Sequence, residues 1–295
     1  MRSNVQEYDL VAAPSLQAVL RMLSEEQGAL TPIAGGTELM VALAAGRLTA
    51  HRLVSIAGLR ELRFIEAAGG RVIIGAGSTF TDIRRNSAIQ TSFPLLSQAA
   101  GWVGGIANQN RATLGGNLAN ASPAADSSPA LLVYEAEITL ISASGMRTLP
   151  YCEFHLGYKK TALRPQELIH SVTLSVPRHL SAGNPVPYIR KVGTRNAMAI
   201  SKTVIAGLAW MGDRTLQGVR LAAASLAPTP VRLFKTESVL TGKPIDDQVL
   251  RAARRTLLAE AAPIDDIRST AQYRSAVAAN LLEDFLAVCH RSFVD

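Results

Sequence analysis

The sequence contains few cysteines and no cluster of metal ligands. Only Cys152 and Cys289 occur among 295 residues, and neither lies in a CxxC or Cys/His group. Iron–sulfur clusters and thiolate-held metals need several such ligands close together. This chain by itself therefore cannot hold an iron–sulfur cluster, and we expect two free structural thiols. The five histidines also lack ligand spacing and are expected to be structural or solvated.

Long apolar runs and aromatic residues are also scarce. No apolar segment reaches the roughly 18 residues of a membrane span, and the opening MRSNVQEYDL lacks the apolar core of a secretory signal. We therefore expect a cytoplasmic protein without a membrane span. The net charge is +7, but the basic residues are dispersed and aromatics make up only 5% of the chain. Proteins that bind single strands interleave basic and aromatic residues, so no nucleic-acid partner is expected.

The chain does have the length and apolar content for two domains. Its 295 residues are 48% hydrophobic and 18% charged, which is typical of a globular protein. Apolar periodicity predicts helices at 14–28 and 37–46, a helix that begins within 79–86, and a helix at 92–105. It predicts strands at 30–33, 51–56, 71–77, 134–142 and 167–177. After a turn-rich link, three strands are predicted within YIRKV, TVIAGLAWM and GVRLAAASL, followed by helices near 247–262 and 268–292. The sequence thus predicts a domain boundary at about 177–186.

The first of two glycine-rich segments is AGGTEL, Ala34 to Leu39, between an apolar strand and a helix. Gly35 and Gly36 allow the backbone to turn sharply and bring its N–H groups against a ligand, and Thr37 can cap the helix. Successive N–H groups at such a turn favour an anion, most often a phosphate. A plain strand–turn–helix connection explains the glycines equally well, so this segment alone leaves both interpretations open.

The second glycine-rich segment is TLGGNLANASPAADSSPAL, Thr113–Leu131. Gly115 and Gly116 permit close approach, Asn117 offers an amide, and Asp126 is a natural acceptor for ribose hydroxyls. We interpret this stretch as a loop around a ligand, and two such loops suit a dinucleotide pyrophosphate better than a single phosphate. Taken alone, the stretch is also compatible with a surface Ω-loop.

A third glycine pair does not indicate a nucleotide. IIGAGSTF supplies Gly75 and Gly77, the first half of GxGxxG, but the sixth position is Phe80. No acidic residue follows about 20 residues later to hold a ribose. A nicotinamide Rossmann domain is therefore not expected, and Gly75 and Gly77 are expected to mark tight packing at a strand end.

Five segments, in this order, carry a family resemblance: AGGTEL, RVIIGAGSTFTDI, RATLGGNLANASPAADSSPALL, GYKKTALRPQELI and APTPVR. Over residues 5–290 the chain resembles the FAD-binding medium subunit of the molybdenum hydroxylases, and FHLGYKKTALRPQELI is more similar to the xanthine dehydrogenase branch than to the carbon monoxide dehydrogenase branch. The resemblance implies an α+β fold. A two-part FAD-binding α/β domain of the PCMH type would span 1–177, with halves at about 1–57 and 58–177. A C-terminal CO dehydrogenase flavoprotein-like domain with a three-stranded sheet and helices would span 186–292.

The same resemblance implies which residues hold FAD. The pyrophosphate would be held by Pro32, Ile33, Ala34, Gly35, Gly36, Thr37, Glu38 and Leu39. The diphosphate and ribityl chain would be contacted from the other side by Thr113, Gly115, Gly116 and Asn117. Asp126 would bind a ribose or ribityl hydroxyl, Ile169 would pack near the adenine or flavin, and Lys191 would reach a flavin edge. No catalytic acid, base or nucleophile and no metal ligand is implied.

The function implied is electron transfer within a larger enzyme. In the family, hydroxylation occurs at a molybdenum cofactor on a large subunit, and electrons pass through two [2Fe–2S] clusters on a small subunit to FAD and then to NAD⁺, oxygen or another acceptor. The implied partners are thus a [2Fe–2S] small subunit and a molybdopterin-binding large subunit, as a dimer of heterotrimers. A stand-alone flavin oxidase of the vanillyl-alcohol oxidase type is the alternative, but residues 186–292 are short for its substrate domain and offer no cluster of catalytic Tyr, Arg or His.

One position departs from the family. Members similar to xanthine dehydrogenase commonly carry an acidic residue just before the isoleucine of the segment that reads RNAMAIS here, whereas this chain has Ala199 before Ile200. That acid lies near the flavin in the family and influences which acceptor can approach. The sequence therefore leaves the electron acceptor open.

Overall fold

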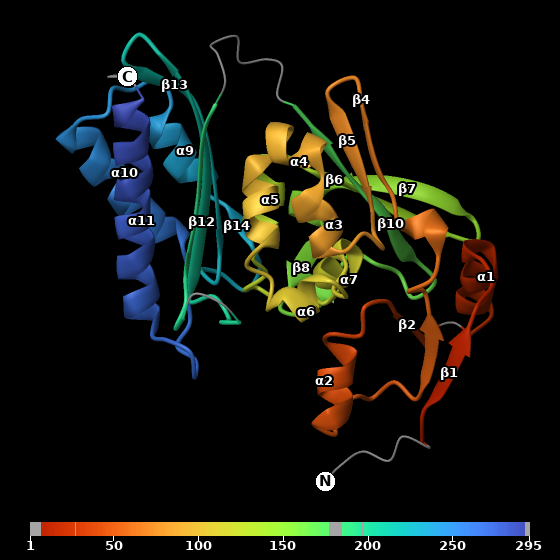
Figure 1. Cartoon of the computed structure of the whole chain (residues 1–295). Coiled ribbons are helices and arrows are strands. Elements are labelled where there is room, and N and C mark those ends of the chain that lie inside the picture. Colours follow the sequence, from red (N-terminus) through yellow and green to blue (C-terminus); the bar gives the residue numbers. More distant parts are fainter. Residues whose placement is uncertain (1–6, 27, 177–184, 196–197, 293–295) are drawn as a thin grey trace.

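Four sheets organise the chain, three of them in sequence order along it (Figure 1). The computed structural model describes residues 7–26, 28–176, 185–195 and 198–292. Figure 1 shows a small N-terminal part, a central part and a C-terminal part, with the central helices between the central and C-terminal sheets. The predicted boundary at 177–186 falls largely on residues 177–184, which lie outside the described residues.

The N-terminal part is a parallel sheet in the order β1–β3–β2, with two helices. Its elements are β1 (Asp9–Ala12), α1 (Leu16–Glu26), β2 (Leu30–Ile33), α2 (Leu39–Ala44) and β3 (Arg52–Ser55). Helix α1 buries the predicted apolar face, formed by Leu16, Val19, Leu20 and Leu23. Helix α2 buries none of its residues. The first glycine-rich segment follows the carboxyl end of β2 and leads into α2.

The central part is a five-stranded antiparallel sheet in the order β4–β5–β10–β6–β7. Its strands are β4 (Ile65–Ala68), β5 (Arg71–Gly75), β6 (Glu137–Ser142), β7 (Gly145–Pro150) and β10 (Leu168–Ser175), and β8 (His155–Gly157) and β9 (Lys160–Thr161) form a separate hairpin. Its helices are α3 (Phe80–Arg85), α4 (Ser87–Ser92), α5 (Pro94–Ala100), α6 (Ile106–Gln109), α7 (Leu114–Ala119) and α8 (Ser128–Val133), with short 3₁₀ turns η2 (Arg60–Leu62) and η3 (Tyr151–Glu153).

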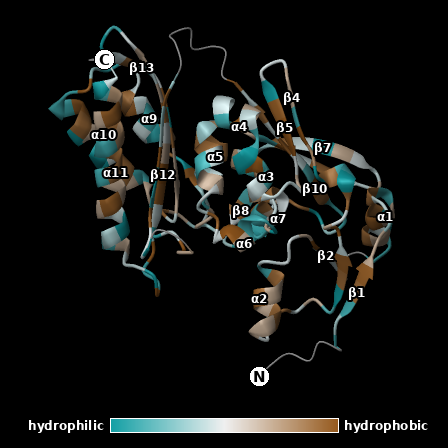
Figure 2. Ribbon diagram, in the orientation of Figure 1, coloured by the Kyte–Doolittle hydropathy of each residue, from teal (hydrophilic) through white to brown (hydrophobic). Residues whose placement is uncertain are grey.

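The C-terminal part is an antiparallel sheet that is covered on both faces. Its elements are β11 (Val186–Val192), β12 (Thr203–Gly212), β13 (Thr215–Ala224), β14 (Val231–Arg232), α9 (Phe234–Leu240), α10 (Asp247–Glu260) and α11 (Ala271–Arg291). Along β12, Val204 and Trp210 enter the central core, whereas Ile205 and Ala209 enter the core beneath α9–α11. Figure 2 shows β12 as hydrophobic along its length. Because both faces are buried, this sheet joins the C-terminal helices to the central part.

Several local predictions need correction. The single helix predicted at 92–105 is wrong in its bounds, because Phe93 separates α4 from α5, and α5 ends at Ala100 with Gly101 as its C-cap. The segment Thr113–Leu131, expected as a loop, contains α7 and most of α8. The three predicted C-terminal strands are present, and the two-residue β14 joins them as a fourth strand at the edge.

Two other predictions are confirmed. A Cβ at Gly75 would lie 2.4 Å from the carbonyl oxygen of Leu62, and one at Gly77 would lie 2.9 Å from the same oxygen, so both glycines mark tight packing. Both cysteines are free; Cys152 is exposed, whereas Cys289 is buried and its burial raises the pKa of the thiol to about 12.

Among the described residues, no helix is long and apolar enough to cross a membrane.

Candidate cofactor site

The first glycine-rich segment lies against Arg111 and Ala112, the two residues directly before the second segment. Gly35 has no room for a side chain, because a Cβ there would lie 1.9 Å from the carbonyl oxygen of Arg111. Gly36 has a φ of +73°, a left-handed conformation that glycine adopts without strain. A Cβ at Gly36 would meet only side-chain carbons of Met40 and Ile33, at 3.4 and 3.7 Å. Gly35 therefore allows the segment to pack closely against Arg111, whereas the backbone conformation of Gly36 determines the turn.

The backbone of this segment is available to a ligand. Within the described part of the chain, no hydrogen bond uses the N–H groups of Gly35, Gly36, Thr37 or Glu38. The expectation that Thr37 caps the helix is wrong, because the N-cap of α2 is Glu38, whose side chain makes no capping hydrogen bond. A turn with several unused N–H groups is a concave site for an anion. Of the other predicted residues, Pro32, Ile33, Ala34 and Leu39 are all half-buried.

The second segment differs, because its N–H groups are already used inside the protein. The N–H of Leu114 donates to the carbonyl of Ser78 at 3.0 Å, and that of Gly115 donates to Ala76 at 2.9 Å. The side chain of Thr113 caps α7 by accepting from the N–H of Gly116 at 3.1 Å. Any contact of this segment with a ligand therefore comes from its surface and side chains rather than from a helix N-terminus.

The two glycines of this second segment have different tasks. A Cβ at Gly115 would lie 2.6 Å from the Cβ of Ala76, so Gly115 is a packing glycine beneath α7. Gly116 is exposed, and the only atom near its hypothetical Cβ is the Thr113 hydroxyl at 3.1 Å. Asn117 is half-buried, and its Oδ1 accepts a hydrogen bond from the Ser127 hydroxyl at 2.7 Å. Gly116 and Asn117 thus present the open surface of this segment.

Lys159 connects the two segments at their rim, in the turn between β8 and β9. Its ammonium donates to Oδ1 of Asn120 at 2.5 Å and lies 3.7 Å from Oε1 of Glu38. Lys159 therefore bridges the two segments, and Gly35 lies against Arg111, two residues before the second segment. Sequence reasoning did not single out Lys159; the only signal was the paired lysines in GYKK.

Comparisons with known proteins identify the family of the chain. Residues 6–178 match the family described as the FAD binding domain in molybdopterin dehydrogenase, and residues 188–288 match the CO dehydrogenase flavoprotein C-terminal domain. The chain belongs to this family. The resemblance drawn from the sequence is confirmed.

The chain is similar to individual curated proteins and to solved structures of this family. It is 31% identical to the xanthine dehydrogenase FAD-binding subunit of Escherichia coli O157:H7, over 82% of each chain. It is 28% identical to the carbon monoxide dehydrogenase medium chain of Hydrogenophaga pseudoflava, over 85% of this chain and 86% of that one. A solved carbon monoxide dehydrogenase from the same organism matches with a TM-score of 0.89 and 25% identity over 96% of both chains.

The residues fit the family's cofactor, FAD. Diphosphate oxygens need several N–H donors that no protein group already occupies, and the Gly35–Glu38 turn offers them. A Cβ at Gly36 would meet only side-chain atoms of Met40 and Ile33, and one at Gly116 would meet only the Thr113 hydroxyl. Among the described residues, no group of three or more His, Cys, Asp or Glu side chains is placed to hold a metal ion. Which of these residues contact FAD stays a prediction.

Asp126 and Lys191, expected on separate parts of the cofactor, contact each other. Their charged atoms lie 2.6 Å apart, and Lys191 also donates to the carbonyl of Trp102 at 3.1 Å. The hydroxyl of Ser201 donates to the other carboxylate oxygen of Asp126. Burial raises the pKa of Asp126, while the Lys191 ammonium and the Ser201 hydroxyl act in the opposite direction. Both oxygens of Asp126 are thus engaged within the chain, and the contacts of this pair with FAD stay predictions.

Ile169 lies in the interior rather than at an open surface. It is 6% exposed, pairs with Leu140 across the central sheet and belongs to the central core. A register shift between Ile169 and Ser171 bends β10 at this point. Its predicted contact with the adenine or flavin stays a prediction, whereas its contribution to the core is evident.

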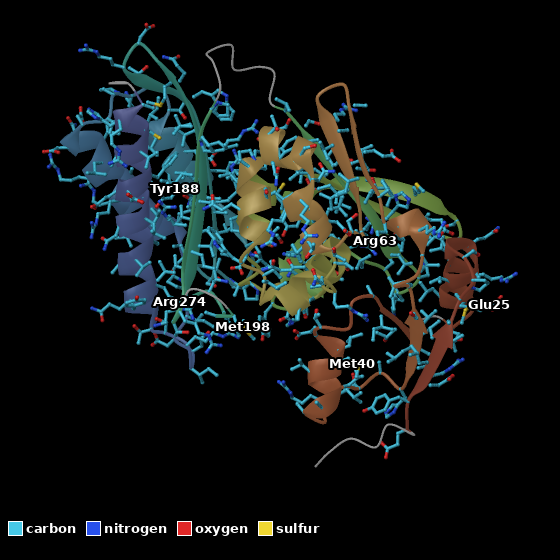
Figure 3. All side chains as sticks on the ribbon, in the orientation of Figure 1. Glu25, Met40, Arg63, Tyr188, Met198 and Arg274 are labelled. Atoms are coloured by element: carbon cyan, nitrogen blue, oxygen red, sulfur yellow. The ribbon has the colours of Figure 1, made fainter. Side chains whose placement is uncertain are left out.

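The loop before β12 touches the central part beside the second segment. Met198 has a φ of +54°, and a Cβ at Gly105 would lie 3.3 Å from its Sδ and Cγ. Figure 3 shows Met198 at the end of the C-terminal sheet, next to the central helices. Ala199 is half-buried in this loop.

Proposed function

We propose that this chain carries FAD in a multi-subunit molybdenum hydroxylase similar to xanthine dehydrogenase. In that role it receives electrons from [2Fe–2S] clusters of a partner subunit and passes them to an external acceptor. The observation that carries the proposal is the close approach of Gly35 to Arg111, two residues before the second glycine-rich segment, beside a turn with unused N–H groups. A stand-alone flavin oxidase is not favoured, because the relatives are named as subunits or chains of dehydrogenases.

The chain's own residues bind and orient the cofactor, and FAD supplies the reversible uptake of electrons. The N–H groups of Gly36 and Thr37 are proposed to hold the diphosphate. Gly116 and Asn117 are proposed to contact it and the ribityl chain from the opposite side. The buried Lys191 and Asp126 would fix the position of the C-terminal sheet beside the flavin end. No residue of the chain is assigned a proton-transfer role.

The proposed partners are a [2Fe–2S] small subunit and a molybdopterin-binding large subunit, assembled as a dimer of heterotrimers. Support comes from the names of the relatives, which include an FAD-binding subunit, a medium chain and an FAD-subunit. A symmetric assembly is the common form of soluble oligomers. A cytoplasmic location is part of the same proposal, and cell fractionation tests it.

Flavin binding and partner capture test this function. The full chain, purified and freed of flavin, is titrated with FAD while flavin fluorescence and absorbance are recorded. We expect saturable binding of an equimolar amount of FAD and, from the native host, co-purification of an iron–sulfur chain and a molybdenum chain. A chain that binds no FAD, or that alone turns over an organic substrate once FAD is added, contradicts the proposal.

A further inference from the structure

The β8–β9 hairpin is fixed on α7 and reaches across to the first glycine-rich segment. At its base, Nε2 of His155 lies 3.2 Å from the carbonyl oxygen of Leu118, which can only accept a hydrogen bond. At its tip, the Lys159 ammonium donates to Oδ1 of Asn120 at 2.5 Å. The same ammonium lies 3.7 Å from Oε1 of Glu38. The hairpin thus carries one positive charge to a defined place beside the proposed diphosphate site.

The backbone at Lys159 adopts a conformation that disfavours a side chain. Its φ is +56°, in the left-handed region that glycine and asparagine adopt more readily than lysine. A residue with a Cβ is strained in this conformation, and glycine would avoid that strain. The contacts of the Lys159 side chain with Asn120 and Glu38 offset it.

Glu38 places a negative charge beside the unused N–H groups of the first glycine-rich segment. Glu38 directly follows Thr37, in the turn whose N–H groups are unused, and its side chain is 61% exposed. A carboxylate at this place repels an incoming diphosphate, since like charges within a few ångströms destabilise each other. Among the ion pairs of the described residues, Glu38 has Lys159 as its partner.

We propose that Lys159 neutralises Glu38 and thereby makes the first glycine-rich segment an effective site for the phosphates of FAD. The inference rests on the proposed function and assigns a specificity-determining residue within it. Lys159 acts through Glu38, so it is a positioning and charge-balancing residue. Its effect concerns ligands that carry phosphate. Riboflavin has the same ring system without phosphates, so its affinity measures the contribution of the rest of the site.

The test compares FAD and riboflavin binding to the flavin-free full chain and its variants. For Lys159→Met we expect the dissociation constant for FAD at low salt to be about two- to fivefold larger, as for a partly exposed charge pair, and that for riboflavin to be unchanged. Lys160→Met, an exposed lysine next in the chain, is the matched control and should bind FAD as the wild type does. Lys159→Arg keeps the charge and should retain most of the affinity.

A second substitution separates charge from simple bridging. Glu38→Gln removes the carboxylate that Lys159 faces, so Glu38→Gln with Lys159→Met should regain most of the lost FAD affinity. In about 1 M salt, where the screening length is about 3 Å, the difference between wild type and Lys159→Met should shrink. Equal FAD binding by Lys159→Met and the wild type, or no recovery with Glu38→Gln, overturns the inference while the proposed function stands. A wild-type chain that binds no FAD overturns both.

Discussion

The carboxylate of Asp126 and the ammonium of Lys191 lie 2.6 Å apart, across the junction between the second glycine-rich segment and the C-terminal sheet. Both side chains are about nine-tenths buried. The main chain adds a second tie at this junction, because the N–H of Ser225 donates to the carbonyl of Pro123 at 2.8 Å. The C-terminal sheet therefore holds the segment that leads into α8.

Breaking this pair should cost stability. Lys191→Met leaves a buried carboxylate without its cation, and removal of one partner of a buried pair typically costs about 3–5 kcal/mol. We expect the free energy of unfolding in urea to fall by that amount. Asp126→Asn with Lys191→Met should be less destabilised than the sum of the single variants, and exposed Lys243→Met serves as the control. Additive losses would show that the pair does not interact.

The glycines that face open space should control flavin retention. Gly116→Val adds a branched side chain to an exposed surface whose only near neighbour is the Thr113 hydroxyl, so the chain should still fold. The same change at Gly36 also forces a β-branched residue into a left-handed conformation, at a cost of about 1–2 kcal/mol.

For both variants we expect loss of bound flavin with a native circular dichroism spectrum. Gly58→Val is the control, because nothing lies within 4 Å of its hypothetical Cβ. If either variant purifies yellow with a full flavin complement, that glycine does not face the cofactor.

The missing acid at Ala199 should influence the electron acceptor. With alanine here, we expect a higher flavin potential and slower reduction of NAD⁺ than of oxygen or a quinone-like dye. Ala199→Asp places a carboxylate in the half-buried loop and should lower the potential by about 30 mV, which is about 1.4 kcal/mol for a two-electron couple. Steady-state turnover of the whole complex with NAD⁺ and with a dye measures the preference.

Ala199→Asn, whose side chain is isosteric with the aspartate of Ala199→Asp, separates charge from size at this position. It should leave both the potential and the acceptor preference near those of the wild type. Efficient NAD⁺ reduction by the wild type, unchanged in Ala199→Asp, would show that this position does not select the acceptor.

Acid stability should depend on Glu167. Its carboxylate accepts from Nε and Nη2 of Arg147 at 2.7 and 2.8 Å and from the N–H of Arg164 at 2.9 Å. The Arg147 guanidinium holds the pKa of Glu167 below its usual value. The folded state therefore favours the ionised form, and this contribution is present above the ordinary glutamate pKa of about 4.3 and is lost as the pH falls through the lower folded value.

Melting curves of Glu167→Gln between about pH 3 and pH 7 test this pair. The variant should melt below the wild type at neutral pH, and the difference should shrink in acid. Glu25→Gln, on the exposed side of α1, is the control (Figure 3). A difference that does not change with pH would exclude the ionised pair as its cause.

The sequence by itself determined the parts of the molecule that depend on local order. Apolar periodicity placed the strand before AGGTEL, the buried face of α1 and the long strands and helices of the C-terminal part, since each of these depends on neighbours a few residues apart. The order of the five motifs was enough to indicate the family. The segment Thr113–Leu131 misled, because its glycines and asparagines suggest a loop, whereas the Thr113 cap and contacts from Ala76 and Ser78 make it helical.

Only the tertiary structure decided which residues of the motifs face a ligand and which serve packing. Gly35 and Gly36 are neighbours of one type, yet Arg111, distant in the sequence, fills the space beside the first and leaves the second free. The pairing of Asp126 with Lys191 and of Lys159 with Glu38 joins residues 65 and 121 positions apart. Periodicity and spacing carry no information about such pairs, because contact over that distance is fixed by how the sheets pack against one another.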